Sequence, residues 1–366
     1  MNIIPIQQWF DDLKDIKHIL IAGPCSAETK EQVLQTAKGI KKIGKINAFR
    51  AGIWKPRTSP KSFEGVGEIG LDWLAEVKNN YGIRTIVEVA TPEHVEKVLK
   101  HNTPTDMLWI GARTSANPFS IQSVADALKG VDIPVLVKNP VIPELKLWIG
   151  AIERFYKNGI QKIAAIHRGF YPYEETKYRN IPKWELLIDF KTKFPEIQII
   201  GDPSHIAGKR ELLEDVIWMF IGLNLDGLMI ETHYNPDIAL SDKAQQITPE
   251  QLDAILKKIK FRMKDTDDDL LNSELKKLRF SIDSIDYQMM ELLSRRMKLV
   301  RKIGLMKKDN NLSIFQLERW KEIVKTRLNY GDELDLDRTL VKKVIKMLHQ
   351  ESINLQSKLF KNGNNE

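Results

Sequence analysis

Short apolar segments recur along the first 230 residues of the chain and alternate with longer segments of helical spacing. Each is rich in β-branched residues and has the length of a strand buried on both faces of a parallel sheet. Eight of them occur, at Ile19–Ile21, Ile46–Phe49, Thr85–Val89, Met107–Ile110, Val135–Val137, Ile163–Ile166, Gln198–Ile200 and Gly227–Ile230. Helical spacing is found at Glu31–Ile43, Gly67–Lys78, Pro92–Leu99, Ile142–Lys157, Trp184–Lys193 and Lys209–Ile221. Eight alternations of strand and helix within about 260 residues favour a closed (β/α)8 barrel, an α/β fold, over an open doubly wound sheet.

The composition is that of a soluble protein with more than one hydrophobic core, because 42% of the 366 residues are hydrophobic and 29% are charged. The chain contains no run of eighteen apolar residues. Its first seventeen residues carry Asp11, Asp12 and Asp15, whereas a targeting segment would be cationic and then apolar. We therefore expect a cytoplasmic protein without a membrane partner.

The single cysteine, Cys25, excludes an internal disulfide and a zinc site built from cysteines alone, although one thiolate can join a mixed ligand set. The net charge of +7 is spread along the chain and forms no basic stripe of the kind that binds nucleic acid. Small anionic substrates explain the basic residues better, and we expect no nucleic-acid partner.

The character of the sequence changes after Phe261. An acidic stretch at 264–269 is followed by a helical pattern that contains neither Gly nor Pro before Gly304. The apolar residues of this pattern follow alternating steps of four and three, as in a long helix that packs against other helices. They are Leu271, Leu275, Leu278, Ile282, Ile285, Met289, Leu292, Leu299 and Ile303.

Two further helices are predicted at Ile314–Leu328 and Asp335–Phe360, separated by a turn at Asn329–Asp332. The C-terminal part of the chain, residues 270–366, is therefore expected to be an all-α, three-helix domain. The predicted organisation is a barrel domain over 1–263, a linker over 264–269 and a helical domain over 270–366.

Basic residues follow four of the predicted strands. The catalytic groups of a (β/α)8 barrel lie just after the strands, at its C-terminal face. The basic residues at these positions are Arg50, Lys55, Arg57, Arg113, Lys138 and Arg168. So many cations at one rim would repel each other unless an anion with several charges binds between them, which suits a phosphate together with a carboxylate.

A possible metal-binding set follows the first, seventh and eighth strands. It consists of Cys25, His205, Glu231 and Asp242. One sulfur, one nitrogen and two carboxylates form a mixed set that suits manganese, iron, cobalt or zinc in an open catalytic site. Taken singly, Cys25 is more often a small buried apolar residue and His205 an ordinary loop histidine.

The motifs at these strand ends resemble those of 3-deoxy-D-arabino-heptulosonate 7-phosphate (DAHP) synthase, the first enzyme of the shikimate pathway, across residues 19 to about 245. They are Gly23-Pro24-Cys25-Ser26, Arg50, Lys55-Pro56-Arg57-Thr58-Ser59-Pro60, Ile110-Gly111-Ala112-Arg113, Val137-Lys138, Arg168-Gly169, Asp202-Pro203-Ser204-His205, Glu231-Thr232-His233-Tyr234-Asn235-Pro236 and Ser241-Asp242. The barrel is similar to members without an N-terminal regulatory domain. The related octulosonate 8-phosphate synthases carry an Asn-containing segment in place of Pro56-Arg57-Thr58, which favours erythrose 4-phosphate over arabinose 5-phosphate here.

The resemblance implies roles for individual residues in a metal-dependent condensation of phosphoenolpyruvate with erythrose 4-phosphate. The implied metal ligands are Cys25, His205, Glu231 and Asp242. The implied phosphoenolpyruvate-binding residues are Arg50, Lys55, Arg113, Lys138 and Arg168, with Lys55 and His205 also catalytic. The sugar phosphate is expected on Arg57, Thr58 and Asn235. One departure is Thr114–Asn117, where many members carry a longer polar run.

Arg296 interrupts the apolar spacing of the predicted long helix. Burying an arginine in an apolar seam costs free energy unless an anion binds to it. Before its neighbours are considered, an arginine at the surface, whose aliphatic stem covers apolar groups, is an equally good interpretation of Arg296. Lys307 lies eleven residues further on, nearly on the same helical face and roughly 16 Å along the axis, so both can bracket one small dianion. Arg279, about 25 Å before Arg296, can reach that ligand only from a second chain.

From about residue 270 to 360 the chain resembles the all-helical chorismate mutases, whose three-helix subunits interlock as dimers. The matching positions are Arg279, Arg296, Lys307, Arg319, Ser352 and Gln356. The resemblance implies that Arg296 and the partner's Arg279 clamp the two carboxylates of chorismate, while Lys307 and Gln356 meet the ether oxygen. It also implies at least a homodimer. The acidic residues of the family appear here as Gln316 and Trp320.

The expected function is thus bifunctional, with DAHP synthesis on the barrel and rearrangement of chorismate to prephenate on the helical domain. In the alternative, the helical domain is mainly a dimerisation and ligand-sensing module that binds chorismate or prephenate and controls the barrel. Such control requires different ligand affinities in two states of the barrel.

Overall fold

The computed structural model of the chain describes residues 1–55, 63–173, 175–259, 261 and 268–361. The chain divides into two compact units, Met1–Lys264 and Asp265–Glu366. We describe each unit by itself. None of the described helices combines the length and the apolar character that a membrane span requires.

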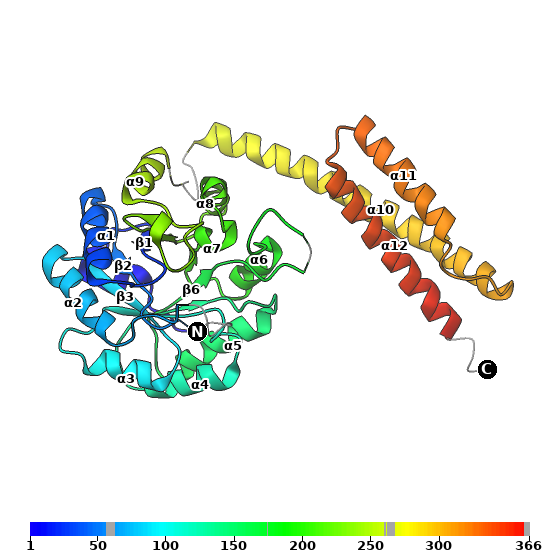
Figure 1. Cartoon of the computed structure of the whole chain (residues 1–366). Coiled ribbons are helices and arrows are strands. Elements are labelled where there is room, and N and C mark those ends of the chain that lie inside the picture. The colour runs from blue at the N-terminus through cyan, green and yellow to red at the C-terminus, as the bar shows by residue number, and fades with distance from the viewer. Residues whose placement is uncertain (56–62, 174, 260, 262–267, 362–366) are drawn as a thin grey trace. The chain divides into compact units, whose positions relative to one another are not determined.

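The first unit is a closed barrel of eight parallel strands with helices around it, which confirms the predicted fold class (Figure 1). Every strand pairs with its neighbours in sequence, and β1 closes the barrel on β8. The strands are β1 Ile19–Gly23, β2 Ala48–Arg50, β3 Arg84–Val89, β4 Met107–Ile110, β5 Val135–Lys138, β6 Ile163–His167, β7 Ile199–Gly201 and β8 Gly227–Glu231.

The outer helices are α1 Lys30–Ile43, α2 Ile69–Tyr81, α3 Pro92–Lys100, α4 Pro118–Ala127, α5 Leu145–Lys157, α6 Trp184–Lys193, α7 Pro203–Ala207, α8 Leu213–Gly222 and α9 Pro249–Lys258. Three of these, α4, α7 and α9, were not among the predicted segments. The side chain of Asn117 caps α4, and a capping box at Thr248 and Gln251 begins α9. Both helices start with a proline that follows a capping residue. The sequence therefore marks them by these local capping residues rather than by a long apolar periodicity.

The barrel has two layers of buried side chains. Residues on the outer strand faces pack against the helices, and alternate residues, among them Ile21, Trp109 and Leu136, fill the barrel interior. The short 3-10 helices η1 Ile6–Gln8 and η2 Asp11–Leu13 add buried side chains to the interior cluster. Asp12 of η2 pairs with Arg84, the first residue of β3, so this segment lies at the N-terminal end of the barrel. Arg50, Lys138 and Glu231 are the last residues of β2, β5 and β8, so these polar side chains lie at the opposite, C-terminal end of the barrel.

The second unit consists of α10 Asp269–Asp309, α11 Leu317–Glu333 and α12 Arg338–Lys361. At about 1.5 Å per residue, the 41 residues of α10 span roughly 60 Å. The C-terminal half of α10 packs against α12, where Gly304 allows close approach to Gln356 and Leu359. This helical unit agrees with the predicted all-α class.

The predicted turn at Asn329–Asp332 is wrong, because α11 continues through it to Glu333. Gly331 lies inside the helix and is buried, and a Cβ there would lie 2.7 Å from a methyl group of Val341 in α12. The glycine thus serves helix packing rather than a turn. The connection falls at residues 334–337, where Asp335 has a φ of 55°.

Candidate active sites

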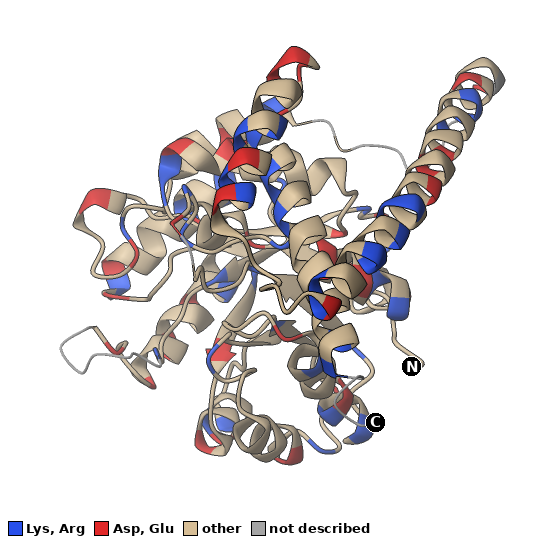
Figure 2. Cartoon of the chain, turned by 90° about the vertical axis from the view of Figure 1, so that its right-hand side faces the viewer, with Lys and Arg blue, Asp and Glu red and all other residues tan. Residues whose placement is uncertain are grey.

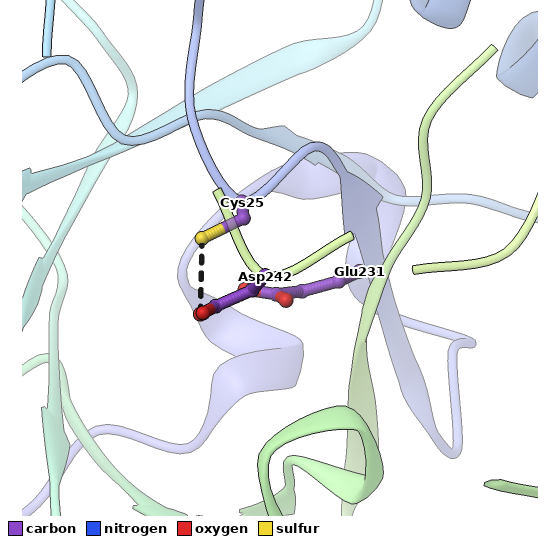
Figure 3. A group of neighbouring side chains, drawn as sticks. All are labelled: Cys25, Glu231 and Asp242. Carbon is purple, nitrogen blue, oxygen red and sulfur yellow. Dashed lines mark hydrogen bonds between the residues drawn. The ribbon is translucent and has the colours of Figure 1, made fainter. Parts of the chain in front are cut away.

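Three of the predicted metal ligands meet where the barrel closes. Cys25 follows β1 by two residues, Glu231 ends β8, and the pairing of β1 with β8 places Gly23 opposite Glu231. The ligand atoms of Cys25, Glu231 and Asp242 all lie within 4.8 Å of one another (Figure 3). The Cys25 thiol also donates a hydrogen bond to Asp242 Oδ2 over 3.4 Å. Parallel strand ends therefore bring residues from distant parts of the sequence into one cluster.

His205, the fourth predicted ligand, lies in α7 next to this cluster. Its Nε2 is 3.7 Å from Glu231 Oε1 and 4.0 Å from Asp242 Oδ2. Its Nδ1 is 2.8 Å from Asp202 Oδ2, and the same Asp202 carboxylate caps the start of α7. A carboxylate on one ring nitrogen orients a histidine so that the other nitrogen faces a metal. The donor set fits a first-row divalent cation.

Burial governs the protonation of this cluster. It raises the pKa of the Cys25 thiol to about 12, and the neighbouring Glu231 carboxylate contributes in the same direction. Burial also lowers the pKa of His205, which keeps its imidazole neutral. For Asp242, burial raises the pKa, but the nearby positive charge of Arg179 outweighs it and holds the pKa below its usual range. The cluster thus holds neutral thiol and imidazole beside ionised carboxylate.

A cavity of about 260 Å³ opens beside the cluster, and basic side chains dominate its lining. They are Arg50, Lys55, Arg113, Lys138, Arg168 and Arg179. Lys55 Nζ is 3.5 Å from Cys25 Sγ, and Lys138 Nζ is 2.8 Å from Asp202 Oδ2. All five predicted phosphoenolpyruvate-binding residues therefore border one space, which also contains Cys25, His205 and Asp242.

Two of the cavity arginines have N–H groups without a hydrogen-bond partner among the described residues. Arg50 is buried and donates one Nη2 bond to Glu231 over 3.1 Å, but its Nε and Nη1 have no partner among the described residues. Arg168 donates to Asn180 over 2.7 Å, whereas its buried Nε has no partner within the described parts of the chain. Buried donors are rarely left unpaired in proteins. These groups are therefore available for an anion.

Of the three predicted sugar-phosphate residues, Asn235 is the one that lies among the described residues. Asn235 is exposed and does not line the cavity. Arg57 and Thr58 lie outside the described residues.

In the helical unit, predicted site residues from α10 and α12 meet. Arg296 Nη1 donates to Ser352 Oγ over 3.0 Å and to the Leu348 carbonyl over 3.3 Å. Gln356, one turn beyond Ser352, is buried, and its Oε1 has no partner among the residues described. Lys307 Nζ donates to the Ile314 carbonyl over 2.7 Å.

Two other predicted residues of the helical unit lie on its surface. Arg319 is exposed and pairs with Glu322 at 2.6 Å. Arg279 is also exposed, seventeen residues before Arg296 in α10, and is thus about 25 Å away along the axis. Arg279 of the same chain cannot share a small ligand with Arg296.

Comparison with known proteins identifies both units. A family model described as the DAHP synthetase I family matches residues 11–267. The chain belongs to this family. A second model, chorismate mutase type II, matches residues 278–357 within the helical unit. Both predicted family resemblances are confirmed, and the DAHP synthase and chorismate mutase domains occur in one chain.

Individual relatives cover the DAHP synthase domain. A phospho-2-dehydro-3-deoxyheptonate aldolase of Thermotoga maritima is 31% identical over 254 residues, which span 68% of this chain and 72% of that protein. A 2-dehydro-3-deoxyphosphooctonate aldolase of Brucella ovis is 27% identical over 263 residues, 66% of this chain and 88% of that protein. The crystal structure of the Thermotoga maritima DAHP synthase matches with a TM-score of 0.59 and 29% identity, over 66% of this chain and 68% of that one.

Four residues of the DAHP synthase site were not predicted from sequence. Arg179 lines the cavity and contacts Asp242 Oδ1 at 3.1 Å and Gln245 Oε1 at 2.6 Å. Gln245 in turn donates to Glu231 Oε2 over 2.7 Å, and Glu88 faces Lys55 at 3.8 Å. Asp202 was noted only as part of a motif. Glu88, inside an apolar strand, was the one with a readable signal, since a charged residue in a buried strand is uncommon.

Proposed function

We propose that this chain is a cytoplasmic, bifunctional enzyme of the shikimate pathway. The barrel condenses phosphoenolpyruvate with erythrose 4-phosphate to give DAHP and phosphate, and the helical domain rearranges chorismate to prephenate. The observation that carries the proposal is the shared cavity, in which six basic side chains surround one space next to the Cys25, His205, Glu231 and Asp242 cluster.

Phosphoenolpyruvate fits this cavity because it carries a phosphate and a carboxylate. Arg50 and Arg168 supply buried guanidinium groups with N–H donors that have no partner in the described parts of the chain, which suit bidentate binding of such anions. Burial lowers the pKa of Lys138, and it lowers the pKa of Arg168 to about 10, so an anion between these groups would relieve the cost of burying charge. Both residues stay charged at neutral pH when an anion binds.

Cys25, His205, Glu231 and Asp242 would hold a divalent cation such as manganese, iron, cobalt or zinc. When bound, the cation supplies Lewis acidity to the aldehyde of erythrose 4-phosphate. Asp202 fixes the His205 ring, while Arg179 and Gln245 hold the carboxylates of Asp242 and Glu231. These contacts hold the four metal-binding side chains in position for the cation.

The basic residues orient the reaction. C3 of phosphoenolpyruvate forms a bond to the aldehyde carbon, water adds to C2, and phosphate leaves. Arg50, Lys138 and Arg168 hold the enol phosphate and compensate the negative charge of the departing phosphate. Lys55, which lies between Cys25 and Glu88, places a further positive charge beside the reacting aldehyde.

Metal uptake is expected to release a proton from Cys25. Its raised pKa keeps the thiol protonated at pH 7, whereas the thiolate is the form that binds a metal. We expect release of about one proton per metal bound and an apparent affinity that rises about tenfold per pH unit near neutrality. Calorimetry of manganese binding in buffers of different ionisation enthalpy measures both. Cys25→Ser should bind more weakly and release no proton, and an equal release by that variant would contradict the assignment.

The mutase reaction needs neither a nucleophile nor a metal. Arg296 and the partner's Arg279 would bind the two carboxylates of chorismate, and Lys307 and Gln356 would meet the ether oxygen whose bond breaks. Holding chorismate in its compact shape and stabilising negative charge on the departing oxygen accelerates such a rearrangement. The contact between Arg296 and Ser352 fixes the guanidinium for this role.

The mutase domain is proposed to act as a homodimer. Leu278, Ile282, Ile285 and Leu292 along α10 are between 56% and 62% exposed, and such a stripe of apolar side chains suits a second copy of the same helix. The distance from Arg279 to Arg296 within one chain supports the same arrangement, with the partner's Arg279 completing each site.

Mixing two inactive variants is expected to restore mutase activity. In a dimer of Arg279→Ala and Arg296→Ala chains, one site contains an intact Arg296 and an intact Arg279 from the other chain. The two variants, each almost inactive, should recover roughly a quarter of wild-type activity after subunit exchange, because about half of the dimers are mixed and each has one intact site. The loss of chorismate, followed by its ultraviolet absorbance, measures the recovery. If affinity tags show that subunits have exchanged and mutase activity still does not recover, the two arginines do not act together across the dimer.

Assays of the full chain test the two activities directly. Phosphate release with erythrose 4-phosphate and with arabinose 5-phosphate separates a DAHP synthase from an octulosonate synthase, and a preference for arabinose 5-phosphate would overturn the barrel assignment. Chorismate binding without turnover would favour the alternative in which the helical domain senses chorismate or prephenate. Repeating the barrel assay with prephenate present measures that regulation.

A further inference from the structure

A histidine that the proposed mechanism does not use lies in the mutase domain. His349, Ser352 and Gln356 are three and seven residues apart in α12, so they occupy one face of the helix. Ser352 accepts a hydrogen bond from Arg296, and a Cβ at Gly304 of α10 would lie 2.9 Å from Gln356 Cγ. This face therefore packs against α10 beside Arg296.

Two aromatic side chains fix the orientation of the His349 ring. The ring stacks on Trp320 of α11, with centroids 4.3 Å apart and an interplanar angle of 26°. Phe315, in the connection before α11, meets it at 6.0 Å and 67°. His349 Nε2 is buried and has no hydrogen-bond partner among the described residues. A buried polar atom that the fold holds in place without a partner indicates a ligand.

The charges around His349 select the kind of ligand group. Burial lowers its pKa, and the positive charges of Arg296 and Lys307 act in the same direction. The imidazole is therefore neutral at neutral pH and lies within the electrostatic reach of both cations. A neutral imidazole near two cations leaves the anionic groups of a ligand to the cations and offers Nε2 to an uncharged polar group.

We propose that His349 contacts the substrate of the mutase domain and that its Nε2 hydrogen-bonds the secondary hydroxyl of chorismate. The inference rests on the proposed mutase function. Chorismate carries two carboxylates, an ether oxygen and one hydroxyl. Arg296, Lys307 and Gln356 account for the charged groups and the ether oxygen, so the hydroxyl is the group left for His349. Trp320 holds the ring in position by stacking.

The test uses His349→Phe in the full chain, because phenylalanine keeps a ring that stacks on Trp320 and removes Nε2. The hydrogen bond exists in both the ground state and the transition state, so KM for chorismate is expected to rise about tenfold while kcat changes less than about threefold. His349→Gln, whose amide can replace Nε2, should recover most of the loss. His94→Phe is the matched control, because His94 stacks on Trp54 of the barrel at 4.1 Å, and it should leave the mutase constants unchanged.

A substrate analogue without the hydroxyl, 4-deoxychorismate, separates this contact from a packing effect. Wild type and His349→Phe should have the same affinity for the analogue if Nε2 binds the hydroxyl. A rise in KM for both substrates would mean that His349 serves packing and would overturn the assignment. An unchanged KM for chorismate in His349→Phe would also overturn it and leave the mutase function standing. A wild-type chain without chorismate turnover would overturn both proposals.

Discussion

Removal of divalent metal from the full chain is expected to lower the rate of DAHP formation by at least about a hundredfold and to leave chorismate turnover unchanged. A bound cation contributes several kcal/mol of charge stabilisation to a carbonyl reaction, and about 1.4 kcal/mol corresponds to a tenfold change in rate. The candidate ligands Cys25, His205, Glu231 and Asp242 all lie in the barrel unit, whereas the mutase residues Arg296, Lys307 and Gln356 are basic or amide groups. The two activities should therefore separate under EDTA.

The experiment follows phosphate release and chorismate loss in the same preparation before and after dialysis against EDTA. Addition of manganese, iron, cobalt or zinc to separate samples should restore DAHP formation and rank the metals. Glu231→Gln should behave like the dialysed protein even with metal present. Equal loss of both activities after dialysis would contradict independent sites, and full retention of DAHP formation would contradict the metal assignment.

Arg296→Ala is expected to reduce mutase activity by about a hundredfold to a thousandfold, the usual effect of removing one donor that stabilises transition-state charge. Arg296 is half-buried, and its contact with Ser352 holds the guanidinium in the seam between α10 and α12. No other described cation of α10 donates to Ser352. Its removal should leave chorismate without its central positive contact.

Arg295→Ala is the matched control, because Arg295 is the neighbouring residue of α10, is exposed and, among the described residues, pairs only with Glu291, at 4.0 Å. It should retain nearly full activity. Thermal unfolding of both variants and their rates of DAHP formation distinguish loss of the site from loss of the fold. Retention of more than about a tenth of the mutase activity by a folded Arg296→Ala protein would refute the role of this arginine.

The sequence was most informative where topology alone determines proximity. In a parallel barrel all strands end at the same face, so Arg50, Lys138 and Glu231 could be placed together without knowledge of any contact. Arg179 could not, because it follows β6 by twelve residues and reaches the cavity through a loop whose path depends on tertiary packing. Gln245 is hidden for the same reason, fourteen residues after β8.

In the helical domain, packing changed what local propensity predicted. Asn329, Gly331 and Asp332 are common in turns, yet the close approach of Val341 makes a glycine favourable inside α11. His349 gave no signal in the sequence, because its significance depends on Trp320 and Arg296, which come from two other helices. The spacing of residues along one helix does not show which side chains of other helices they will contact.

The Asp202 carboxylate connects the proposed metal site with the proposed anion site. It is fully buried, orients the His205 ring and contacts Lys138 Nζ, while Arg50 similarly connects the cavity with Glu231. The metal and the anion would therefore bind to one electrostatically linked unit, and each would change the affinity for the other by the same factor. Engineering a different metal preference by replacing a single ligand would alter phosphoenolpyruvate binding as well, so ligand and cation positions have to be redesigned together.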